Sequence, residues 1–207
     1  EMVFICSQYS SATAPCNAQI AQINDIVKKY DDTAMVIGEA PLMKDLEDVT
    51  SVDLMTVNTL SILAIFLIVM IVFKSVSLPF ILVTTIEFSI FVNMAFSCYR
   101  GVSQAFVAPI VVGTIQLGAT VDYAILMTNR YKDERMAGRS KKEAIEIAHK
   151  TSFHSIITSA FSLFASTIGV AMYSNIDMIK SIVILLARGA LISMAIVLLL
   201  LPSFFLV

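Results

Sequence analysis

The sequence predicts a mainly α-helical membrane protein, in which a five-helix transmembrane bundle follows a small α+β segment. Of the 207 residues, 57% are hydrophobic and only 14% are charged, whereas charged residues make up about 25% of a typical soluble domain. Five apolar segments are each near the roughly 20 residues that a helix needs to cross the hydrocarbon core of a bilayer. These observations favour a multi-pass membrane protein over a soluble one.

Residues 1–54 are the polar part of the chain, with nine acidic residues against three lysines. Short apolar runs at 2–6 and 33–37 predict two strands, and Asn17 is a candidate N-cap for a helix between them. Residues 42–53 predict a further, polar helix. Because a strand–helix–strand unit of this size buries little apolar surface, we expect it to be a fragment of a larger α+β domain.

Five apolar segments predict the transmembrane helices, and the polar residues between them mark their ends. The predicted spans are residues 55–73, 80–98, 107–129, 152–173 and 181–207. A charged link at 130–150 mixes basic and acidic side chains with small apolar ones, which is typical of an amphipathic helix at the membrane surface. Residues 55–207 therefore form the predicted transmembrane bundle.

The basic residues predict the orientation of this bundle. The link at 130–150 carries seven of the fourteen Lys and Arg residues, and loops rich in these residues stay on the cytoplasmic side of a membrane. With this link inside, the acidic N-terminal segment is extracytoplasmic and the C-terminus is cytoplasmic. Acidic residues interrupt the positive charge of the link, so we expect no nucleic-acid binding.

Asp122 and Tyr123 are the leading candidate site, because a carboxylate stands inside a long apolar run. An ionised Asp near the centre of a membrane helix costs about 2.5–3.5 kcal/mol on insertion scales. A chain this apolar would not carry such a residue there for stability. We expect Asp122 to face a protein interior or a wet cavity, where it can exchange a proton or pair with a cation; a purely structural carboxylate is the alternative.

Two further sets of polar residues could support this site. Hydroxyl side chains recur at intervals of three and four in the fourth predicted span and fall on one helix face; they are Ser155, Thr158, Ser159 and Ser162. Their hydroxyls could hydrogen-bond Asp122 or hold water, or they could serve only as small residues for close helix packing. Glu87, a second acidic residue within a predicted span, could be another proton or cation site or a structural carboxylate.

Motifs for other kinds of chemistry are missing from the sequence. The two histidines and three cysteines show no metal-ligand spacing, and the segment GTIQLG lacks the Lys-Ser/Thr of a phosphate-binding loop. We therefore predict no metal, no cofactor and no enzyme activity. An ion gradient remains as the energy source.

Several motifs, found in order along the chain, resemble the resistance–nodulation–division (RND) transporter superfamily. They are FKSVSLPF, GATVDYAILMTNRYKDER, GRSKKEAIEIAHK, SIITSAFSLFASTIG, LLARGALISM and LLLLPSFF. The resemblance covers essentially the whole chain, which is most similar to the MMPL branch found in Gram-positive bacteria.

The resemblance implies an architecture and a function. The chain would correspond to the end of an extracytoplasmic porter domain and helices two to six of the C-terminal transporter half, with the other half as its partner. Asp122 and Tyr123 match the family's Asp–Tyr pair, which implies a proton relay. The implied activity is export of lipids or other hydrophobic or amphipathic compounds across the bacterial cell membrane, driven by the proton-motive force. The alternatives are a non-transporting lipid- or sterol-sensing-like or assembly module of this fold, or a protein-translocation accessory.

Overall fold

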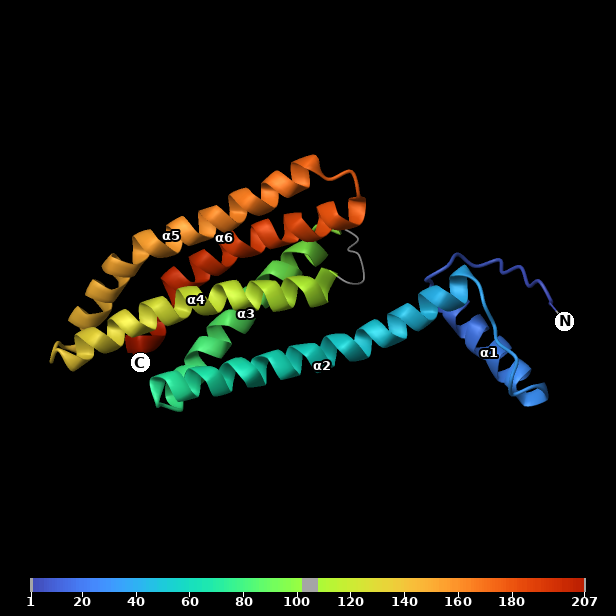
Figure 1. Cartoon of the computed structure of the whole chain (residues 1–207), viewed down its shortest axis with the longest axis horizontal. Helices are drawn as coiled ribbons and strands as arrows, with labels where there is room; N and C mark the ends of the chain where they lie inside the picture. Colours follow the sequence, from blue (N-terminus) through green and yellow to red (C-terminus); the bar gives the residue numbers. More distant parts are fainter. Residues whose placement is uncertain (1, 102–107, 207) are drawn as a thin grey trace. The chain divides into compact units, whose positions relative to one another are not determined.

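The structure is a computed structural model that describes residues 2–101 and 108–206. In these residues it contains six helices and no β-strand (Figure 1). The helices are α1 (Ala14–Tyr30), α2 (Glu39–Phe73), α3 (Ser77–Tyr99), α4 (Ala108–Met136), α5 (Lys141–Tyr173) and α6 (Asp177–Leu206). The chain divides into two compact units, Glu1–Leu54 and Met55–Val207.

In the first unit, α1 begins three residues before the predicted N-cap. Thr13 stands at the N-cap position and Pro15 lies in the first turn, where a backbone N–H has no partner within the helix and is not missed. Asn17 therefore lies inside the helix, and its prediction as the cap is wrong. Its side-chain Nδ2 instead donates a hydrogen bond to Glu47 Oε2 at 2.8 Å, within the same unit.

The two strands predicted for this unit are absent from the part of the chain that the structure describes. Residues 2–6 and 33–37 have no regular structure, and no backbone hydrogen bond between described residues joins them. An isolated strand is not stable, because its backbone groups need partner strands, and neither segment finds one here. The α+β prediction for this unit is therefore wrong for residues 2–54.

α2 joins two elements that the sequence predicts as separate. The polar helix at 42–53 and the first span at 55–73 are parts of one helix of 35 residues, about 52 Å long at 1.5 Å per residue. No Gly or Pro interrupts the chain between residues 42 and 73, so the polar segment continues directly into the apolar one.

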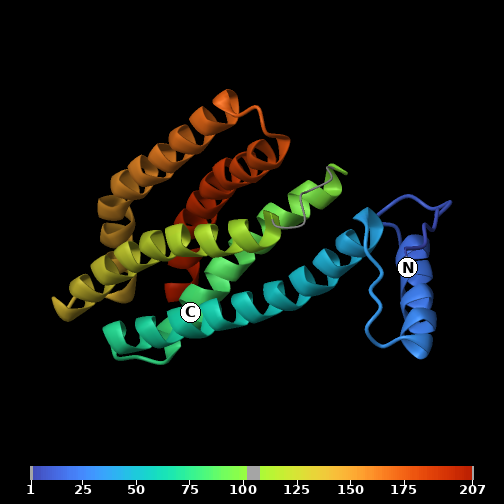
Figure 2. The ribbon, with the colours of Figure 1, turned by 45° about the vertical axis from the view of Figure 1, so that its right-hand side comes forward.

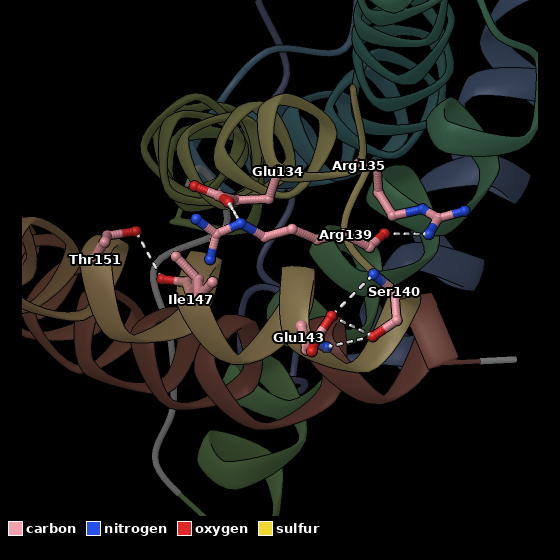
Figure 3. Close-up of polar contacts among 7 residues, drawn as sticks. All are labelled: Glu134, Arg135, Arg139, Ser140, Glu143, Ile147 and Thr151. Carbon is pink, nitrogen blue, oxygen red and sulfur yellow. Dashed lines mark hydrogen bonds and ion pairs between the residues drawn. The ribbon is translucent and has the colours of Figure 1, made fainter. Parts of the chain in front are cut away.

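The charged residues at 130–150 also lie in the ends of two long helices rather than in a separate surface helix. α4 continues to Met136 and α5 starts at Lys141. In the turn between them, Gly138 has a φ of +84°, which glycine adopts without steric cost. Ser140 then caps α5 through reciprocal hydrogen bonds with Glu143 (Figure 3).

The other predicted spans fall within observed helices. α3 contains residues 80–98 and α5 contains residues 152–173, while α4 and α6 contain the described parts of the third and fifth spans. Residue 107, the predicted start of the third span, and residue 207, the predicted end of the fifth, lie outside the described residues. Because α2 to α6 are all long and apolar enough to cross a membrane, the chain is a multi-pass membrane protein.

In the second unit, α3 to α6 pack into one bundle (Figure 2). α5 lies along α6, α4 packs against both, and α3 contacts α4 and α6. The apolar core lies toward the end of the bundle that carries the α4–α5 turn. Its buried residues are Val69, Phe73, Leu82, Tyr123, Ala124, Met127, Ile145, Ile156, Ala160, Val197, Leu198, Leu201 and Phe205.

Candidate functional site

A group of buried polar side chains joins α3, α4 and α6 beyond the apolar core. Its members are Ser89, Asn93 and Ser97 on α3, Gln116 on α4, and Ser193 with the half-buried Arg188 on α6. We call these six residues the polar network. A membrane offers no water to buried polar groups, so such groups need partners within the protein.

Asn93 connects three helices through one side chain. Its Nδ2 donates to Gln116 Oε1 at 2.7 Å and to the Leu185 carbonyl oxygen at 3.2 Å. Its Oδ1 accepts a hydrogen bond from Arg188 Nε at 2.8 Å. Both amide hydrogens and the amide oxygen are therefore used, which fixes α3 against α4 and α6.

Gln116 extends this network to the next turn of α6. Its Nε2 donates to Ser193 Oγ at 2.9 Å, and Ser193 shares a hydrogen bond with Ser89 Oγ at 3.2 Å. Gly189 makes this close approach possible, because a Cβ there would lie 2.5 Å from Gln116 Oε1 and 2.7 Å from Asn93 Nδ2. The network thus depends on a residue without a side chain at this position.

Asn93, Ser193 and Arg188 were not predicted as parts of a site. The signal that could have found Asn93 and Arg188 is their presence in apolar spans, where a polar side chain must find partners. No regular spacing along the sequence marks the three helices as neighbours. The network is therefore visible only in the folded bundle.

Asp122 and Tyr123 are consecutive residues of α4 that face different surroundings. Asp122 is exposed and forms no ion pair with any described residue. Tyr123 is only 5% exposed and belongs to the apolar core, together with Met127. Neighbouring residues of a helix point about 100° apart. One member of the pair is therefore anchored in the core, while the other is presented outside it.

The predicted hydroxyl face of α5 lies outside the packed bundle. All four residues, Ser155, Thr158, Ser159 and Ser162, are exposed. Thr158 Oγ1 donates to the His154 carbonyl oxygen and Ser162 Oγ to the Thr158 carbonyl oxygen, each at 2.8 Å. Two of the hydroxyls thus bond their own helix, and no hydrogen bond between described residues joins this face to Asp122.

Glu87 is half-buried on α3 and stands apart from the polar network. Its Oε1 is buried and has no hydrogen-bond partner among the described residues. A buried polar atom without a partner does not stabilise the fold, so packing alone does not explain this carboxyl group. No three His, Cys, Asp or Glu side chains in residues 2–101 and 108–206 lie close enough together to hold a metal ion.

Charged residues crowd the turn between α4 and α5. Arg139 Nε forms an ion pair with Glu134 Oε2 at 2.8 Å, and Arg135 Nη1 donates to the Arg139 carbonyl oxygen at 2.6 Å (Figure 3). Lys141 and Lys142 at the start of α5 are exposed. This end of the bundle therefore keeps a basic surface next to the apolar core.

The comparisons with known proteins agree with the membrane architecture. A model described as MMPL family matches residues 2–207. YdgH of Bacillus subtilis (strain 168), whose name classes it as a membrane protein, is 28% identical over 167 residues, which are 72% of this chain and 19% of YdgH. MmpL4 of Mycobacterium leprae (strain TN), whose name classes it as a transport protein, is 24% identical over 181 residues, 83% of this chain and 18% of MmpL4. The chain thus spans about a fifth of the length of these curated relatives.

Proposed function

Because this chain belongs to the MMPL family, we propose that it forms part of a proton-driven transporter that exports lipids or other amphipathic compounds across the bacterial cell membrane. Its similarity to MmpL4, which is named as a transport protein, supports a role in transport. Five helices able to cross the membrane support the same role. The observation that carries the proposal is the exposed carboxylate of Asp122 on α4.

An exposed carboxylate within a membrane span needs a polar environment. Facing lipid, an ionised Asp122 would be unfavourable by about 2.5–3.5 kcal/mol, and no ion pair within the described chain offsets this. We therefore propose that Asp122 faces a second transporter half, in the same polypeptide or in another subunit. The exposed hydroxyls of Ser155, Thr158, Ser159 and Ser162 are available to that partner or to water, and Glu87 is a candidate second acidic site.

The relay uses a change of charge at Asp122. When Asp122 is ionised it favours water or a cationic partner, and when it is protonated it tolerates an apolar neighbour. Because the next residue, Tyr123, packs in the core, a force on α4 at Asp122 would act directly on the packing of α4 against its neighbours. Proton binding and release at Asp122 would thereby drive a shift of α4 within the bundle.

The basic end of the bundle supports a cytoplasmic α4–α5 turn. Exposed Arg130, Lys141 and Lys142 lie at this end, and such residues favour the cytoplasmic side. In this orientation the C-terminal end of α6 is cytoplasmic and the acidic residues 2–54 are extracytoplasmic.

The test is gradient-dependent export of a fluorescent lipid by the full-length protein in vesicles. Asp122→Asn keeps the size of the side chain, but the amide of Asn cannot ionise. We therefore expect export to fall to background, while expression and thermal stability stay unchanged. Asp133→Asn, which removes another exposed carboxylate from α4, is the matched control and should export normally. Full export by Asp122→Asn would contradict the relay.

Measurements on the wild type distinguish a proton-driven transporter from a lipid-sensing or assembly module. Export that rises with the imposed proton gradient supports the proposal. Lipid binding without any dependence of export on the gradient would instead favour a lipid-sensing or assembly module.

A further inference from the structure

Arg188 is a cation within the bundle that the described chain does not neutralise. Its Nε donates to Asn93 Oδ1 and its Nη2 to the Asn93 carbonyl oxygen, each at 2.8 Å, and Nη2 also donates to Ser97 Oγ. All these acceptors are neutral, and no carboxylate of the described residues forms an ion pair with Arg188. The acceptors orient the guanidinium, but they leave its positive charge uncompensated.

One nitrogen of the guanidinium also has no acceptor among the described residues. Nη1 donates to no described residue, whereas Nε and Nη2 are both used. The guanidinium carbon lies over the Phe96 ring, 4.9 Å from the ring centroid, and Phe96 is 45% exposed. A planar guanidinium with a free N–H edge suits a phosphate or carboxylate oxygen. The Nη1 group of Arg188 can therefore donate a hydrogen bond to an oxyanion.

The inner side of this site is rigidly held. Asn93 is fully buried and Ser97 is 1% exposed, and Asn93 is fixed in turn by Gln116. Gly189, which directly follows Arg188, leaves room for this packing. The guanidinium is thus oriented before any ligand arrives, which reduces the entropy lost on binding.

Arg100 adds a second positive charge to the same face of α3. It follows Ser97 by three residues, a spacing that places both on one side of the helix. Arg100 is exposed at the C-cap of α3. Exposed aromatic surface continues beside it at Phe96 and Tyr99. The end of α3 therefore combines positive charge with apolar surface, as an anionic amphiphile requires.

We propose that Arg188, with Arg100 and Phe96 beside it, binds the phosphate or carboxylate headgroup of an anionic amphiphile where α3 ends and α6 begins. The headgroup oxygen would accept a hydrogen bond from Arg188 Nη1, and the acyl chain would lie on the exposed apolar surface of α3. This inference goes beyond the proposed function, because it depends on Arg188 and not on proton exchange at Asp122. Binding can be measured without a gradient, so a failure here leaves the relay untouched.

The test compares two short-chain lipids that differ in headgroup charge. The full-length protein in phosphatidylcholine nanodiscs is titrated with dihexanoyl-phosphatidylglycerol and dihexanoyl-phosphatidylcholine, and both dissociation constants are measured calorimetrically. We expect the wild type to bind the anionic lipid about tenfold more tightly, a difference of about 1.4 kcal/mol. Both lipids offer a phosphate oxygen, but the choline cation of the zwitterionic lipid is repelled by Arg188 and Arg100. Arg188→Gln should reduce this preference to about twofold or less.

Controls separate the site from general surface charge. Lys180→Gln removes an exposed cation from the first turns of the same helix and should keep the tenfold preference. If Arg188→Gln does not fold, Arg188→Lys keeps the charge but loses the planar fork, and we expect an intermediate preference of about threefold. Equal binding of both lipids by the wild type, or an unchanged preference in Arg188→Gln or Arg188→Lys, would overturn the proposal.

A further arm distinguishes an amphiphile from a free anion. Inorganic phosphate should displace the anionic lipid only at concentrations at least about tenfold above those of the lipid itself, because it lacks the apolar contact. Displacement at equal concentrations would show a small-anion site and would overturn the assignment to an amphiphile.

Discussion

The bundle holds polar side chains in two contrasting ways. Around Asn93 the amide groups are buried and hydrogen-bonded across three helices, whereas Asp122, about 9 Å further along α4 than Gln116, is exposed and unpaired in the described chain. A closed network holds helices together. The exposed carboxylate of Asp122 does not hold helices together, which indicates an interaction with a group outside the bundle. The contrast separates residues that stabilise the fold from a residue, Asp122, that is available for proton exchange or for contact with a partner.

The largest loss of stability is expected from Asn93→Leu. The substitution leaves Gln116 Oε1 and Arg188 Nε without this partner, and each group orphaned in this way costs about 1–3 kcal/mol. The Leu185 carbonyl oxygen also loses its hydrogen bond from Asn93. We expect a clear fall in the thermal unfolding temperature of the purified protein. Asn58→Leu, at an exposed position of α2, is the control and should unfold like the wild type. Equal unfolding temperatures for the two variants would contradict the role of the network.

Gly189→Ala should have the next largest effect. Its added Cβ would meet Gln116 Oε1 at 2.5 Å, and overpacking of this kind costs about 1–3 kcal/mol. Gly118→Ala on α4 is the matched control, because nothing lies within 4 Å of its added Cβ. We expect the control to be neutral or stabilising in the same unfolding measurement. If both variants unfold at the temperature of the wild type, the helices are not closely packed at Gly189.

Asp122→Asn tests the exposed carboxylate in the same comparison. Because Asp122 forms no ion pair and is exposed, we expect its free energy of unfolding to change by no more than about 0.5 kcal/mol. Thermal unfolding measures this change, and Asn93→Leu provides the scale. A loss as large as that of Asn93→Leu would make Asp122 a structural residue.

A third kind of polar environment, a fully solvent-exposed turn, gives the smallest expected effect. Hydrogen bonds from the Thr33 hydroxyl and backbone N–H hold the pKa of Asp31 below its ordinary value of 3.8. Such a carboxylate stabilises the folded state above its unfolded pKa, and this contribution is lost as the pH falls through the lowered, folded pKa. Thr33→Ala should move the pKa of Asp31 back toward 3.8 in an NMR titration. An unchanged pKa would show that the Thr33 hydroxyl does not control it.

The sequence predicts the membrane helices well because their signal is local. Long apolar runs mark the apolar parts of α3, α5 and α6. The motifs along the chain point to the MMPL family, whose model matches residues 2–207. The predicted strands at 2–6 and 33–37 are wrong for the described chain because strand formation depends on distant partners, which an apolar run alone cannot supply.

The site is only partly predictable for a related reason. An intramembrane Asp is conspicuous in the sequence, but the direction in which it points depends on how α4 is rotated against its neighbours. Asn93, Gln116 and Ser193 lie on three different helices, so no local spacing links them. The hydroxyls on α5 follow a helical period, yet the packed face of α5 is formed by other residues, such as Ile156 and Ala160.

Proton flux linked to substrate tests the central claim most directly. The full-length protein is placed in vesicles that contain a pH-sensitive dye, a proton gradient is imposed, and the fluorescent lipid is then added. We predict a lipid-dependent proton flux in the wild type and in Asp133→Asn, and none in Asp122→Asn at equal protein content. An equal flux in Asp122→Asn, or no lipid-dependent flux in the wild type, would contradict a proton relay at Asp122.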